Sequence, residues 1–98
     1  MVARNRYFVC YDVRDPQRLT QTYKTMCGYG DRVQYSVFLC DLSDVELVMM
    51  RGDLENVMNT KEDSLVIVNV GSVEKSGARI TTVGTSLGTQ RRDASIVV

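Results

Sequence analysis

Asp12 is the residue of this chain best placed to do chemistry. It ends the apolar run from Tyr7 to Tyr11 and stands just before a strong helix start at Asp15 and Pro16. A carboxylate at the carboxyl end of a buried strand lies where layered α/β proteins commonly build their sites. Its oxygens suit a hard cation such as Mg²⁺ or Mn²⁺, which lowers the pKa of a bound water. The alternative is that Asp12 only terminates the strand.

Two arginines follow Asp12 closely. Arg14 and Arg18 carry guanidinium groups that can hold phosphate oxygens through paired hydrogen bonds. The twelve basic residues, nine of them arginine, are balanced by twelve acidic residues, so nucleic acid binding would depend on local arginine clusters. A single aspartate is a poor metal site. Two copies of Asp12 that face each other across a dimer axis would make a better one.

The composition excludes several classes of site. The chain has no histidine, which rules out Ser-His-Asp and Cys-His catalysis and histidine-bound zinc. Cys10, Cys27 and Cys40 are odd in number and lack metal-ligand spacing, so we interpret them as reduced core residues of a cytosolic protein. No apolar run approaches the roughly twenty residues of a membrane helix. We therefore expect one soluble cytoplasmic domain, of a size at which an oligomeric partner would add stability.

The hydrophobic pattern predicts the elements that hold these residues. Residues 6–12 are apolar on both faces, which is typical of a strand in the middle of a sheet. Residues 16–27 have helical spacing, with Asp15 as the N-cap and Pro16 at the first helical position. The side chains expected to share the buried face of this helix are Leu19, Tyr23, Met26 and Cys27.

The middle of the chain predicts further strands and a second helix. Residues 31–42 are rich in strand-forming residues, and periodicity alone favours one long strand, although a tight reversal near Tyr35 and Ser36 is an alternative. A capping box that begins at Ser43 then opens a helix to about Met58. Gly52 inside this helix is expected to mark close packing against another backbone.

The order of elements predicts a ferredoxin-like α+β sandwich. In this β-α-β-β-α-β fold the last strand, residues 65–70, lies at a sheet edge, and an exposed edge this apolar would promote aggregation. Residues 79–83 are the available covering strand, either within the chain or, as we prefer, by exchange in a homodimer. We therefore expect a domain over residues 1–84 that includes this strand, and a tail over residues 85–98.

A second polar group extends from Arg32 to Phe38 and could by composition be an ordinary strand with a polar outer face. It follows Gly28-Tyr29-Gly30-Asp31. Together with Tyr11-Asp12-Val13, an arginine early in the following helix at Arg18, and the apolar strand 65–68, this run resembles the CRISPR-associated protein 2 family over roughly residues 6–83.

The resemblance implies a ferredoxin-like homodimer whose C-terminal strand crosses to the partner's sheet. Such a dimer works with the integrase, CRISPR-associated protein 1, to acquire new spacers from foreign DNA. The resemblance also implies a metal-dependent endonuclease on RNA or duplex DNA, with Asp12 holding Mg²⁺ or Mn²⁺ at the dimer interface. Arg18 and Arg32 would meet phosphates, Tyr11 would flank the site, and Ser36 and Phe38 would shape the turn and the interface.

The resemblance favours the reversal near Tyr35 and Ser36 over one continuous strand. The tail over 85–98 either docks on the integrase or is disordered. Three functions remain open: a metal-dependent nuclease, a non-catalytic scaffold that holds the duplex backbone without needing Asp12, and a toxin ribonuclease of the virulence-associated protein D type.

Overall fold

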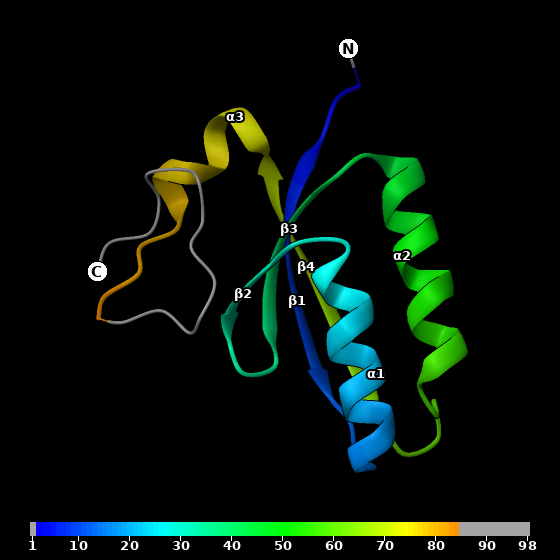
Figure 1. The fold of residues 1–98 in the computed structure, drawn as a ribbon. Coiled ribbons are helices and arrows are strands. Elements are labelled where there is room, and N and C mark those ends of the chain that lie inside the picture. Colours follow the sequence, from blue (N-terminus) through cyan, green and yellow to red (C-terminus); the bar gives the residue numbers. More distant parts are fainter. Residues whose placement is uncertain (1, 85–98) are drawn as a thin grey trace.

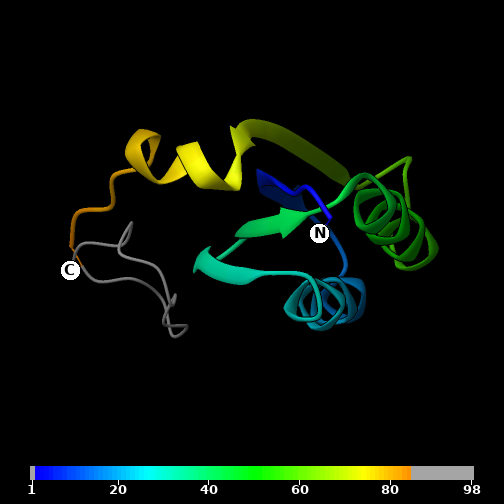
Figure 2. The same cartoon turned by 90° about the horizontal axis from the view of Figure 1, so that it is seen from above.

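The computed structural model describes residues 2–84, apart from the side chain of Ala78. It has a mixed α+β architecture in which a four-stranded sheet carries its two long helices on one face (Figures 1 and 2). The predicted ferredoxin-like order is confirmed. The elements are β1 (Asn5–Asp12), α1 (Pro16–Cys27), β2 (Asp31–Gln34), β3 (Val37–Leu42), α2 (Asp44–Val57), β4 (Ser64–Ser72), α3 (Val73–Ser76) and the 3-10 helix η1 (Gly77–Arg79).

The strand β1 lies inside the sheet, as its apolar faces predicted. The order across the sheet is β2-β3-β1-β4, and every neighbouring pair is antiparallel. β1 is therefore hydrogen-bonded on both sides, with Asn5 opposite Leu42 of β3 and Asp12 opposite Ser64 of β4. Both edges are formed by other strands, β2 on one side and β4 on the other.

Alternation along β1 separates a core face from an open face. Tyr7, Val9 and Tyr11 are buried beneath the helices. Because successive strand residues point to opposite sides, Phe8, Cys10 and Asp12 lie on the other face of the sheet. On β4, the residues Leu65 and Ile67 pack against the core, while Val66 and Val68 are 54% and 46% exposed. We call the side that carries Phe8, Cys10, Asp12, Val66 and Val68 the open face.

Helix α1 begins as predicted. The Asp15 side chain accepts a hydrogen bond from the Arg18 backbone N–H at 3.0 Å, and Pro16 occupies the first turn. Met26 is fully buried. The expectation of a buried Leu19 and Cys27 was wrong, because both are exposed and the fully buried Thr22 takes the inner position between them. The hydroxyl of Thr22 donates to the Arg18 carbonyl at 2.8 Å, which satisfies it without a polar neighbour.

Residues 31–42 form a hairpin and not one strand. The two strands are joined at Tyr35 and Ser36, as the resemblance implied. The register shifts by one residue at Val33, between the pairs of Arg32 with Phe38 and Gln34 with Val37. The bulge lies next to the turn, and among residues 2–84 only two glycines, both outside the hairpin, have positive φ. The turn therefore has no residue with positive φ, and Ser36 is its one residue of a type common in turns.

Helix α2 has the predicted capping box. Ser43 Oγ accepts from the Glu46 N–H, and the Glu46 carboxylate accepts from the Ser43 N–H at 2.8 Å. The inner face buries Met50 and Leu54 completely. Gly52 does not mark close packing, because a Cβ built there would meet no atom within 4 Å among the described residues.

The chain after β4 differs from the prediction. Gly71, with φ of +108°, turns the chain into α3 and η1, and Arg79 Nη1 donates to the Val70 carbonyl at 2.9 Å. Residues 79–83 form no strand within this chain. Arg79 ends a 3-10 helix and only Thr82 makes an isolated β-bridge. Exchange of this segment onto a partner stays a prediction, and the predicted tail over 85–98 lies outside the described residues. Within residues 2–84, no helix is long and apolar enough to cross a membrane.

Candidate nucleic-acid site at the end of the central strand

Four segments meet at one end of the sheet. Asp12 ends β1, the hairpin turn lies on one side of it, and the start of α1 and the loop before β4 lie on the other (Figure 1). The Tyr11 N–H donates to the Ser36 carbonyl at 3.0 Å, which places the turn directly beside the strand end. On the opposite side, the Arg14 N–H donates to Asp63 Oδ1 at 2.9 Å.

Asp12 and Arg14 form the accessible part of this site. Their side chains are 68% and 70% exposed, and Arg14 Nη2 lies 4.0 Å from Asp12 Oδ2. An ion pair of this length between exposed groups contributes little to stability. Both charges are therefore accessible to solvent, and their roles in binding metal and nucleic acid stay predictions.

Arg18 is already bound within the protein. Its Nε and Nη2 donate to the two oxygens of Asp63 at 2.9 and 3.1 Å, and Nη2 also lies 3.5 Å from Glu62. The Asp63 carboxylate is fully buried and accepts further backbone N–H bonds from Arg14 and Asn59. The hydrogen bond from Arg18 is the main reason that the pKa of Asp63 falls well below its ordinary value.

This ion pair gives Arg18 a role that its position in the sequence does not reveal. It ties the first turn of α1 to the loop before β4 and so fixes the segment that follows Asp12. The Nε and Nη2 groups of Arg18 both contact carboxylates, so the predicted contact of Arg18 with phosphate stays a prediction. The partner, Asp63, lies in what the sequence marks only as a polar loop.

Arg32 stands on the other side of the strand end, between two aromatic rings. Its guanidinium carbon lies 4.9 Å from the centroid of Tyr23 and 5.7 Å from that of Tyr35. Its Nε is buried and has no hydrogen-bond partner among residues 2–84. Cation–π attraction therefore holds this arginine in place. Burial raises the pKa of Tyr11, an effect that the nearby Arg32 charge partly offsets.

The predicted supporting residues divide between the site and the core. Ser36 lies in the turn, as expected. Tyr11 flanks the strand end from the core side and is only 5% exposed. Phe38 is completely buried, with ring centroids 6.2 Å from Tyr11 and 5.9 Å from Tyr23. The Phe38 side chain thus packs inside its own protomer and has no exposed surface to offer an interface.

The residues of one chain provide a partial donor set for Mg²⁺ or Mn²⁺. Within the described part of the chain, no three acids or cysteines gather in a group that could hold a metal. Asp15 is used as a helix cap and Asp63 by Arg18, which leaves Asp12, with its 4.0 Å ion pair to Arg14, as the exposed carboxylate that ends β1. Magnesium is commonly held by one or two carboxylates together with waters, so the donor chemistry fits if a second chain supplies the second carboxylate.

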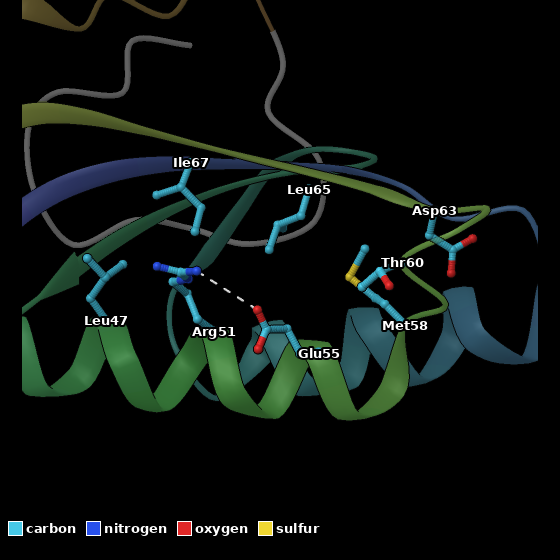
Figure 3. A pocket seen from close by; sticks show the side chains of 8 residues that line it. All are labelled: Leu47, Arg51, Glu55, Met58, Thr60, Asp63, Leu65 and Ile67. Atoms are coloured by element: carbon cyan, nitrogen blue, oxygen red, sulfur yellow. Dashed lines mark ion pairs between the residues drawn. The ribbon is translucent and has the colours of Figure 1, made fainter.

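A separate cavity of about 500 Å³ lies between α2 and β4. None of the predicted site residues lines it, and the buried Asp63 is the one lining residue that also belongs to the strand-end site. Leu47, Leu65 and Ile67 point into it, and Arg51 crosses its mouth 3.9 Å from Glu55 (Figure 3). It opens on the helix side of β4, whereas Asp12 lies on the open face. The cavity is therefore not part of the strand-end site.

Comparison with known proteins agrees with this fold. Residues 5–76 match the family model described as CRISPR associated protein Cas2. The chain is 35% identical over 95 residues to the CRISPR-associated endoribonuclease Cas2 1 of Rhodospirillum rubrum, covering 97% of this chain and 93% of the relative. It is 32% identical to the CRISPR-associated endoribonuclease Cas2 of Geobacter sulfurreducens, covering 93% and 96%.

A solved structure extends the comparison to three dimensions. The crystal structure of Streptococcus pyogenes Cas2 aligns with a TM-score of 0.71 and 32% identity, over 81% of this chain and 99% of the other. The family model spans the strand-end aspartate and the hairpin that carried the resemblance. The chain therefore belongs to the CRISPR-associated protein Cas2 family.

Proposed function

We propose that two copies of this chain associate through their open faces and form a metal-dependent endonuclease centred on Asp12. The observation that carries this proposal is the alternation of β1 side chains between the two faces of the sheet, which puts Asp12 on the open face. Asp12 shares the open face with the half-buried Phe8 and Cys10 and with the exposed Val66 and Val68 of β4, apolar residues that favour association. A twofold axis through this surface would bring two Asp12 side chains toward each other.

The roles of the residues follow from their exposure. The Asp12 carboxylates would hold Mg²⁺ or Mn²⁺, which supplies a water of lowered pKa for attack on a phosphodiester. Arg14, exposed beside Asp12, is placed to hold a phosphate oxygen. Arg18 keeps the segment after Asp12 in position through Asp63. RNA is the proposed substrate because the relatives are named endoribonucleases, and duplex DNA is the alternative.

Cleavage of a single-stranded RNA in the presence of Mg²⁺ or Mn²⁺ tests this proposal. We expect Asp12→Asn to abolish cleavage, because the amide removes the ligand charge without changing the shape of the side chain. Asp44→Asn, an equal charge change at an exposed position on α2, is the matched control and should cleave at the wild-type rate. Undiminished cleavage by Asp12→Asn, or sedimentation as a stable monomer under assay conditions, would overturn the proposal.

We also propose strand exchange between the two copies. β4 pairs only with β1 among the described residues, so its outer edge keeps unpaired backbone groups next to the exposed Val66 and Val68. Residues 79–83 of a second copy, which form no strand on their own chain, would complete this edge.

A role in spacer acquisition with the integrase, CRISPR-associated protein 1, is a further part of the proposal, and it places the protein in the cytoplasm. The lack of a group of three acids or cysteines in the described part of one chain is also compatible with a scaffold that binds duplex DNA without cutting it. Spacer uptake in cells that carry Asp12→Asn separates the two roles. Uptake lost while the complex stays intact supports a catalytic role, and uptake retained without cleavage supports the scaffold.

A further inference from the structure

We infer that Tyr35 is a stacking platform for an unpaired base of a single-stranded substrate, next to the phosphate held at Asp12. This inference rests on the proposed function and adds a residue that determines which nucleic acid the site accepts. It begins from an unusual exposure. Tyr35 is 75% exposed, whereas the other six aromatic side chains, all within residues 2–84, are buried or half-buried.

Apart from the cation–π contact with Arg32, the structure gives no local reason for an aromatic residue at this position. Two-residue turns favour glycine, asparagine, aspartate or serine, and a tyrosine here contributes no turn chemistry. The Tyr35 ring also adds nothing to the hydrophobic core, because it is exposed and is not part of the buried cluster that contains Phe38 and Tyr11. Exposed aromatic side chains are instead commonly used to stack on unpaired bases of nucleic acids.

The Tyr35 ring is positioned by a neighbouring cation. Arg32 lies 5.7 Å from the ring centroid and is itself anchored on the half-buried Tyr23. The ring is thus supported by a cation whose position is fixed, while most of its surface remains free. A cation beside an aromatic ring is the combination that binds the base and backbone of single strands.

The position of the turn connects this platform to the strand end. The bond from the Tyr11 N–H to the Ser36 carbonyl sets the turn immediately beside Asp12. Arg32, which contacts Tyr35, packs against Tyr23 on the helix side of the strand end, whereas Asp12 lies on the open face. A nucleotide whose phosphate lies at Asp12 and Arg14 would therefore pass round the end of the sheet to bring its neighbouring base to Tyr35. Bases inside a duplex are already stacked on each other, so the platform selects unpaired strands over duplexes.

Binding is measured by fluorescence anisotropy in the Asp12→Asn background without divalent metal, so that cleavage does not enter. The probes are a labelled unstructured RNA, the matching DNA strand and the corresponding duplex. For Tyr35→Ala we expect a Kd for both single strands that is about 5-fold to about 150-fold higher, the range of losses for one stacked base. Duplex binding should change less than about twofold, and Tyr35→Phe should keep single-strand affinity.

Two further readouts separate stacking from other causes. The substitution removes no charge, so the slope of log Kd against log salt should stay the same while affinity falls. An abasic nucleotide at the stacked position should weaken binding to the Tyr35 protein but not to Tyr35→Ala. The inference is overturned if Tyr35→Ala leaves the single-strand Kd unchanged, or if it weakens single strands and duplex by the same factor. Cleavage by Asp12→Asn would refute the proposed nuclease alone and leave this result standing.

Discussion

Phe38→Leu tests whether the aromatic cluster beneath the sheet is a source of stability. The Phe38 ring is fully buried and contacts Tyr11 and Tyr23, with centroid distances of 6.2 and 5.9 Å. Leucine keeps much of the apolar volume but loses both ring pairs, which together contribute about 1–3 kcal/mol. A domain of this size has a free energy of unfolding of about 5–15 kcal/mol, so the variant should still fold.

Urea unfolding followed by far-ultraviolet circular dichroism measures the loss. With a slope of about 1–3 kcal/mol per molar urea, we expect the midpoint to fall by about 1 M. Phe38→Ala, which removes the whole ring, should cost about 3–5 kcal/mol. Tyr35→Phe is the control and should leave the midpoint unchanged, because that side chain is exposed.

Sedimentation distinguishes this core role from the interface role that the family resemblance implied for Phe38. If the ring stabilises the protomer itself, Phe38→Leu lowers the free energy of unfolding while association at native conditions is retained. The reasoning is refuted by an unchanged midpoint, or by a variant that dissociates while its isolated protomer unfolds at the wild-type midpoint.

Three substitutions elsewhere test the packing and the electrostatics. Gly52→Ala should raise stability by up to about 1 kcal/mol, because the helix gains propensity and the new Cβ meets no described atom within 4 Å. Gly30→Ala should lower the thermal midpoint strongly, since its Cβ would lie 2.5 Å from the Leu39 carbonyl oxygen, and an unchanged midpoint would contradict that geometry. Arg4 donates to Glu46 and lowers the pKa of that carboxyl from 4.5 to about 2, so its stabilisation is present above pH 4.5 and is lost as the pH falls toward 2. Glu46→Gln should therefore flatten the acid side of the stability curve in that range, as measured by urea midpoints at successive pH values.

The sequence predicted the elements that have strong local signals. The apolar faces of β1, the Asp15 cap of α1 and the capping box at Ser43 each depend on neighbouring residues, and each is confirmed. The hairpin at Tyr35 was not readable from periodicity. The chain reverses beside a bulge at Val33 without glycine or asparagine, so the usual turn signal is absent.

The site was predictable only in part. Asp12 and Arg14 are two residues apart in sequence and lie close in space, so their juxtaposition could be foreseen. The Arg18 ion pair could not, because Asp63 is 45 residues away and only the folded loop brings the two together. The exposure of Cys27 depends likewise on how α1 is rotated against the sheet, which one periodic face does not determine.

The central place of β1 affects how the polypeptide acquires its structure during synthesis. β1 leaves the ribosome first, yet one of its two rows of hydrogen bonds is made with β4, whose residues run from Ser64 to Ser72. The sheet stays incomplete until that late segment has emerged, and pairing over such sequence separations is slow. Nascent chains thus carry an apolar strand with one unpaired row of backbone groups through most of translation. Such exposed strands are aggregation-prone, so we expect chaperones to bind them.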